Sequence, residues 1–137
     1  MSHPVKPWFT PASDLDVIAE KSTPDLTATV KDEDGNTIAG SSLVTLTLTL
    51  YNKSTGAIIN SRDAQNVLNT NQVTVDGSGL LTFAMLALDT VIVDATLATG
   101  SLETHVALFT YTWLDGAVTK TGRHLVEHQV EQLLKVT

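Results

Sequence analysis

The stretch of sequence that decides the fold is Leu43-Val44-Thr45-Leu46-Thr47-Leu48-Thr49-Leu50-Tyr51, in which apolar residues alternate with threonine. Side chains alternate across a β-strand with period two, so an extended conformation separates the two kinds of residue onto opposite faces. A helix would scatter both kinds around its surface. A strand here therefore has one buried face and one solvated face. The residues predicted to face the core are Val44, Leu46, Leu48 and Leu50.

The rest of the chain repeats this alternation in shorter runs. Threonine fills 21 of the 137 positions, and turn residues separate the runs at the spacing typical of a sandwich. The predicted fold class is all-β, an immunoglobulin-like antiparallel β-sandwich. In residues 88–100, Val91-Ile92-Val93 fits either a strand or part of a loop that crosses between the sheets, and the loop is favoured. Residues 61–66 are expected to form a turn or a single helical turn. Strands are predicted at 26–31, 43–51, 57–60, 72–75, 81–85, 105–113 and 119–132, with turns at Asp34-Gly35-Asn36, Asp76 to Gly79 and Asp115-Gly116. A helical spacing also fits 125–134, but the hairpin context favours a strand.

The first 24 residues are expected to form an extended, proline-containing N-terminal arm, followed by one sandwich domain over residues 25–137. All four prolines of the chain lie in this arm, where each removes a backbone donor and stiffens the chain. Trp8 and Phe9 lie among them. They either fold back onto their own sandwich or dock onto a neighbouring subunit, because aromatic residues are enriched where interfaces bury them. Asp14 to Glu20 is expected to form a short strand or one helical turn.

Composition excludes several classes of function. A formal charge of −7 with only eight basic residues argues against binding to nucleic acid, where affinity grows with each phosphate that Lys or Arg neutralises. The chain has no cysteine, so it has no thiol nucleophile, cysteine zinc site or disulfide. Neither a signal peptide nor a run of 18 apolar residues is found, so we expect a soluble protein without a membrane partner.

One local string has the form of an enzyme motif. His124-Leu125-Val126-Glu127-His128 matches the H-x-x-E-H pattern of inverted zinc metallopeptidases. That chemistry requires both histidines on one face of a helix and a further carboxylate ligand far downstream. Only nine residues follow His128, and the segment is predicted to be a strand. We therefore expect His124 and His128 to lie on one strand face with Val126, partly buried or at a subunit contact.

Other candidate sites have simpler explanations. Asp32-Glu33-Asp34-Gly35-Asn36 resembles part of a calcium loop but lacks two obligatory oxygen ligands, so a solvated hairpin turn is expected, with a loose cation site as the alternative. No G-x-S-x-G elbow and no glycine-rich phosphate loop is present. The sequence therefore predicts no catalytic residues, no metal site and no cofactor.

Several segments resemble small immunoglobulin-like proteins that are encoded among the structural genes of tailed bacteriophages. The resemblance covers about residues 26–136 and consists of framework strands and turns without a catalytic signature. The segments that carry it are Leu46 to Tyr51, Thr55 to Val67, Val73 to Asp76, His105 to Trp113, and Gly122-Arg123-His124 onward.

This resemblance implies a non-enzymatic virion protein that decorates or stabilises the capsid, or that lies at the head–tail joint. Its partners would be shell or neck proteins and copies of itself, and the residues expected to bind them are Trp8, Phe9 and Trp113. One alternative is a tail baseplate or fibre-anchoring module with the same fold. Another is an adhesin or carbohydrate-binding domain that uses Trp113 and Tyr111 as an exposed sugar platform.

Overall fold

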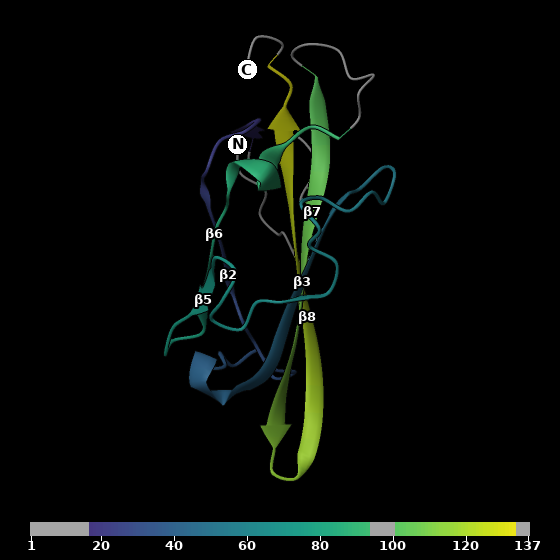
Figure 1. Cartoon of the computed structure of the whole chain (residues 1–137). Coiled ribbons are helices and arrows are strands. Elements are labelled where there is room, and N and C mark those ends of the chain that lie inside the picture. Colours follow the sequence, from purple (N-terminus) through teal and green to yellow (C-terminus); the bar gives the residue numbers. More distant parts are fainter. Residues whose placement is uncertain (1–16, 94–100, 134–137) are drawn as a thin grey trace, which may run out of the picture.

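The protein is all-β and folds as two facing sheets. The computed structural model describes residues 17–93 and 101–133. A five-stranded sheet has the order β1-β8-β7-β3-β4, and a three-stranded sheet has the order β2-β6-β5 (Figure 1). The predicted all-β sandwich is thus confirmed. The elements are β1 Val17–Ala19, β2 Asp25–Thr29, η2 Gly40–Ser42, β3 Leu43–Asn52, β4 Gln65–Asn66, β5 Val73–Val75, β6 Leu80–Ala84, η3 Ala87–Thr90, β7 Leu102–Asp115 and β8 Val118–Glu131.

The longest feature is the hairpin of β7 and β8. Each strand has 14 residues, and the pairing runs without a break from Leu102 opposite Glu131 to Asp115 opposite Val118. β3 lies antiparallel along the other side of β7, whereas β1 lies parallel to the last residues of β8. The predicted strand and turn are confirmed here, and the helical alternative is wrong for β8.

The alternation in β3 holds except at its start. Leu46, Leu48 and Leu50 are completely buried, as predicted. Val44 is half exposed, because the register against β7 shifts between Leu43 and Thr45. This bulge turns two consecutive residues outward and places Leu43 in the core instead. The prediction for Val44 was therefore wrong.

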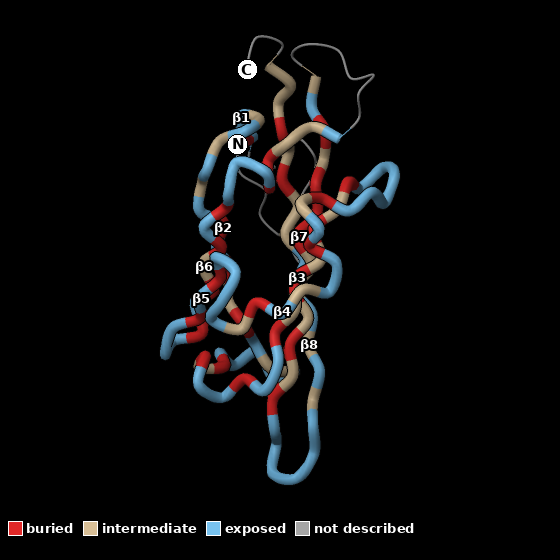
Figure 2. The backbone as a smooth tube through the Cα atoms, viewed as in Figure 1, coloured by how far each residue is buried: buried red, intermediate tan, exposed pale blue. Residues whose placement is uncertain are grey.

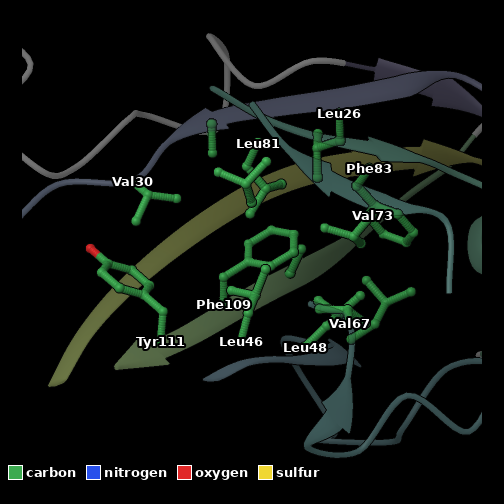
Figure 3. Packing of buried hydrophobic residues seen from close by; sticks show 14 of the residues in the cluster. Leu26, Val30, Leu46, Leu48, Val67, Val73, Leu81, Phe83, Phe109 and Tyr111 are labelled. Carbon is green, nitrogen blue, oxygen red and sulfur yellow. The ribbon is translucent and has the colours of Figure 1, made fainter. Parts of the chain in front are cut away.

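The core lies between the two sheets and is built from the alternating inward residues of both. Phe83 of β6 and Phe109 of β7 meet edge to face with their ring centroids 6.3 Å apart. Figure 2 shows how buried and exposed positions alternate along the strands, and Figure 3 shows side chains of both sheets converging on this pair. Leu81 and Met85 are also buried, as predicted.

The short elements differ from the prediction between residues 57 and 66. The strand predicted at 57–60 is reduced to one bridge between Ile58 and Tyr51, and β4 forms instead within the stretch predicted as a turn. Positive φ angles of 52° at Asn60, 57° at Ser61 and 49° at Ala64 turn the chain away from β3 before β4 begins. Residues 91–93 belong to no strand, in agreement with the predicted loop.

Part of the segment expected as an arm is integrated into the sheet. β1 confirms the strand alternative for the stretch around residues 17–19. Trp8 and Phe9 lie outside the described residues, so their placement and the division of the chain at residue 24 remain predictions.

Candidate functional site

A groove of about 540 Å³ lies where the end of β2 faces β7 and the first half of β8. Its floor consists of aromatic residues of β7, and its rim carries charged residues of both signs. Its size is in the range of small-ligand and side-chain sites. The lining residues are Ala28, Thr29, Lys31, Asp32, Glu33, Tyr111, Trp113, Thr121, Gly122, Arg123 and His124.

The floor of the groove is rigid. The rings of Tyr111 and Trp113 lie 5.8 Å apart, and the two residues are only 3% and 8% exposed. The Tyr111 hydroxyl donates a 2.7 Å hydrogen bond to the Lys31 carbonyl, which ties β7 to the segment after β2. Burial raises the pKa of this phenol. Gly122 lies under the same ring: a Cβ atom there would be 2.6 Å from it, so only glycine fits.

The rim residue Glu33 pairs with Lys120 of β8, which lies beside the groove and does not line it. Lys120 Nζ lies 2.9 Å from Glu33 Oε2, and this contact lowers the pKa of the Glu33 carboxyl and raises that of the Lys120 ammonium. Burial, with the charge of Lys31, lowers the pKa of His124. The rim therefore favours neither anions nor cations.

The acidic turn at 32–34 is a hairpin turn, as expected. Asp32 Oδ1 accepts hydrogen bonds of 2.9 Å from the backbone N–H groups of both Asp34 and Asn36. The carboxylates of residues 32–34 lie within 4.8 Å of one another and could hold a cation. However, the Asp32 carboxylate already accepts the hydrogen bonds of the turn, and the Glu33 carboxylate already pairs with Lys120.

The H-x-x-E-H residues do not converge. His124 and His128 lie on the inner face of β8, as predicted, because a strand brings residues of equal parity to one face. Glu127 points to the opposite face, where it accepts a 3.0 Å hydrogen bond from Lys53 Nζ. These three residues therefore do not form the helical arrangement that an inverted zinc metallopeptidase requires.

A buried polar cluster lies at the other end of the inner face. His105 Nε2 is 2.5 Å from Glu103 Oε1, which also accepts a hydrogen bond from the Val93 N–H. The rings of His105 and His128 stand 5.7 Å apart. Neither ring nitrogen of His128 has a hydrogen-bond partner among the described residues, although the side chain is 0% exposed. Burial, and then the neighbouring His105, lower the pKa of His128 to about 4.

A second buried network, which sequence reasoning missed, joins the loop after β3 to η3. Arg62 Nε donates a 2.6 Å hydrogen bond to Asp89 Oδ1, and both side chains are buried. The guanidinium also lies 4.8 Å from the Phe83 ring centroid. Its remaining donors bind Gln65 Oε1, the Asn71 carbonyl and Gln72 Oε1. The Arg62 guanidinium nitrogens are all hydrogen-bonded, so this network holds the loops in place and Arg62 has no nitrogen available for a ligand.

The tip of the β7–β8 hairpin exposes apolar side chains. The pairing of β3 with β7 ends at Leu43 and Trp113, so the residues after Trp113 form a two-stranded projection beyond both sheets (Figure 1). Leu114 and Val118 at this tip are each 58% exposed. Leu114 is opposite Thr119 and Val118 is opposite Asp115, so the two side chains lie on opposite faces of the ribbon, and each is available separately for contact with another protein.

The predicted partner-binding residues have different outcomes. Trp113 lies in the groove floor and is buried, and so is Tyr111, so the two do not form the exposed platform that the sugar-binding alternative requires. Trp8 and Phe9 lie outside the described residues.

Comparisons with known proteins identify no relative: no family model, no curated protein and no solved structure matches the chain. Within residues 17–93 and 101–133, no helix has the length and apolar character needed to cross a bilayer.

Proposed function

We propose that the chain is a non-enzymatic structural protein of a tailed-bacteriophage virion, which decorates or stabilises the capsid or lies at the head–tail joint. It would act by contacts with shell or neck proteins and with copies of itself. The proposal starts from the resemblance of residues 26–136 to immunoglobulin-like phage proteins. The charge of −7 is compatible with it, because an acidic surface does not adhere to packaged DNA.

The observation that carries the proposal is the projecting hairpin tip. Leu114 and Val118 are each 58% exposed, and they lie on a projection that the sandwich does not need for its own core. Burying such a tip against a neighbour is favourable, and in an assembly of many copies weak contacts multiply.

The sheet order supports the immunoglobulin-like assignment within this proposal. In a variable-type immunoglobulin sandwich, strands B, E and D form one sheet, and strands G, F, C and C′ form the other. The orders β2-β6-β5 and β8-β7-β3-β4 fit this arrangement. The long hairpin then corresponds to strands F and G.

The alternatives differ in how well they fit. A baseplate or fibre-anchoring module would use the same contacts in fewer copies. The carbohydrate-binding alternative loses its main argument, because Tyr111 and Trp113 are buried.

The proposal is tested by quantitative mass spectrometry of particles purified from the lysate in which the chain is produced. An amount near that of the major shell protein is expected for capsid decoration, and a small fraction of it for a neck or tail component. Absence of the chain from purified particles would contradict the proposal.

The role of the hairpin tip is tested in the same particles with Leu114→Asp together with Val118→Asp. The variant is expected to fold normally and to be lost from the particles. Leu80→Asp is the matched control, because Leu80 is also an exposed apolar residue but lies in the three-stranded sheet. Normal incorporation of the tip variant would exclude the tip as the contact. Deletion of residues 1–11 is likewise expected to leave the sandwich folded and to abolish attachment to the partner, and unchanged incorporation of the truncated protein would reject this expectation.

A further inference from the structure

Within residues 17–93 and 101–133, the first half of β8 is paired along one edge only. Gln132 N–H donates to the Ser101 carbonyl on the β7 side, whereas the Glu131 carbonyl accepts from Glu20 N–H on the β1 side. Because the N–H and C=O of one residue point to the same side of a strand, even-numbered residues of β8 face β7 and odd-numbered residues face away. β1 covers only Gln129 to Glu131. The outward groups of Thr119, Thr121, Arg123, Leu125 and Glu127 have no strand partner within the described part of the chain.

The groove lies directly beside this edge. Tyr111 is opposite Gly122, and Trp113 is opposite Lys120, in the pairing of β7 with β8. A strand added to the free edge would therefore place its inward side chains next to the groove floor. Gly122 contributes no side chain to this row, which leaves the Tyr111 ring within reach of a neighbouring strand.

The chain itself contains a segment that fits the edge. β1 pairs with β8 in parallel, and Val17 lies opposite Gln129. Each residue of β1 therefore lies opposite the β8 residue whose number is 112 higher. If this register continued toward the N-terminus, Phe9 would lie opposite Thr121 and Trp8 opposite Lys120. Ile18 is buried and Val17 exposed, so even-numbered residues of such a strand point inward. Trp8 would point toward the groove, and Phe9 toward the outer surface.

The prolines of this segment obey the same parity. Glu20 N–H points to β8, so even-numbered residues of the extended β1 would supply the hydrogen bonds to β8 and odd-numbered ones would not. Pro7 and Pro11 are both odd. Each would have its missing N–H on the solvent side, which is where an edge strand tolerates proline. Prolines there also protect the new edge from further pairing.

The buried His128 gives a second, independent observation. Both of its ring nitrogens lack a partner among the described residues, although buried polar atoms are normally hydrogen-bonded. If the register that pairs Val17 with Gln129 continued by one residue, Asp16 would lie opposite His128 on the inner face. A carboxylate is the acceptor that an imidazole N–H prefers.

We propose that residues 8–16 continue β1 along the free edge of β8, in the same copy of the chain, with Trp8 covering the Tyr111–Trp113 groove and Asp16 beside His128. The edge is thus a strand-docking site whose occupant is the N-terminal segment. Phe9 remains on the outer surface, where it is available to a partner.

The register is tested by disulfide trapping, for which the chain offers a cysteine-free background. Pro11→Cys with Arg123→Cys joins residues that are directly opposite in the proposed register, at a distance a disulfide can span. Pro11→Cys with Leu125→Cys is the matched control, displaced by roughly 7 Å along the strand. We expect the first pair to form an intramolecular disulfide about tenfold faster than the control. Equal rates would overturn the register, and a disulfide between two chains would overturn docking within one copy.

The parity is tested with two proline substitutions in the otherwise unchanged full chain. Ala12→Pro removes an N–H that would face β8, whereas Ser13→Pro removes one that would face solvent. We expect Ala12→Pro to accelerate hydrogen exchange of the Leu125 amide about tenfold and Ser13→Pro to leave it nearly unchanged. Similar effects of the two substitutions would overturn the proposal.

Discussion

The two halves of β8 differ in what covers them, although they belong to one continuous strand. From Gln129 to Glu131 the strand lies between β7 and β1, and Val130 and the preceding His128 are completely buried. From Val118 to Glu127 the described residues cover it only on the β7 side, and Leu125 is 50% exposed. An open edge beside an aromatic groove is a place where a strand can be added, whereas the closed half is already part of the core.

The largest expected effect concerns the acid stability of the closed half. A buried His128 with a pKa of about 4, against about 6.5 in the unfolded chain, binds its proton less readily when folded. The free energy of unfolding then falls by about 3 kcal/mol as the pH drops from about 6.5 to about 4. In the full chain a carboxylate at residue 16 would oppose this. We therefore expect Asp16→Asn to lose more stability over this range than the unchanged chain, in urea titrations at a series of pH values.

The Glu103–His105 pair is common to both proteins in that comparison, so its own titration cancels. Identical pH profiles would mean that Asp16 does not contact His128. A direct histidine titration by NMR distinguishes the same outcomes at the ring itself.

The next largest effect on the free energy of unfolding is expected when one apolar side chain is truncated in each half of β8. Val130→Ala should lower the free energy of unfolding by about 2 kcal/mol, because the side chain is completely buried. Leu125→Ala removes more atoms from an exposed position and should change stability by less than about 0.5 kcal/mol. Equal losses in chemical denaturation would show that the Leu125 side chain is as deeply buried as that of Val130 and would contradict this difference.

The fit of Tyr111 over Gly122 can be broken by one methyl group. Gly122→Ala brings a Cβ atom to 2.6 Å from the ring, which is held by its hydrogen bond to Lys31, and should cost about 1.5 kcal/mol. Gly77→Ala is the matched control, since nothing lies within 4 Å of a Cβ atom there. A thermal unfolding midpoint unchanged by Gly122→Ala would mean that the groove floor is adaptable.

The smallest effect is expected at the outer face where the two halves meet. Lys53→Met removes the ion pair with Glu127, and because Lys53 is half exposed the loss should stay below about 1 kcal/mol. The loss should shrink in high salt, since screening weakens exposed pairs. A salt-independent loss would point to packing of the Lys53 stem instead.

The sequence predicted those parts of the fold in which side-chain period alone decides the structure. The alternation of β3 placed Leu46, Leu48 and Leu50 in the core correctly. The outward turn of Val44 escaped prediction, because a bulge depends on the register of the partner strand. The position of β4 also escaped prediction, because it depends on the turn that precedes the strand.

The candidate site was less predictable, because it depends on contacts between distant residues. The groove joins Lys31 and Tyr111, which are 80 residues apart in sequence. The Arg62–Asp89 pair spans 27 positions between two loops, and no local pattern marks either residue. In contrast, the strand conformation of His124 to His128 followed from the hairpin pattern, which correctly placed both histidines on one face.

The most direct test of whether the N-terminal segment covers the first half of β8 is residue-resolved amide hydrogen exchange of the full chain at neutral pH. We predict that the outward amides of Thr121, Arg123 and Leu125 exchange as slowly as that of Glu131, which lies opposite β1, because the N-terminal segment covers the rest of the edge. Fast exchange of these three amides beside slow exchange of the even-numbered amides that face β7 would contradict it, and would leave the edge of β8 open.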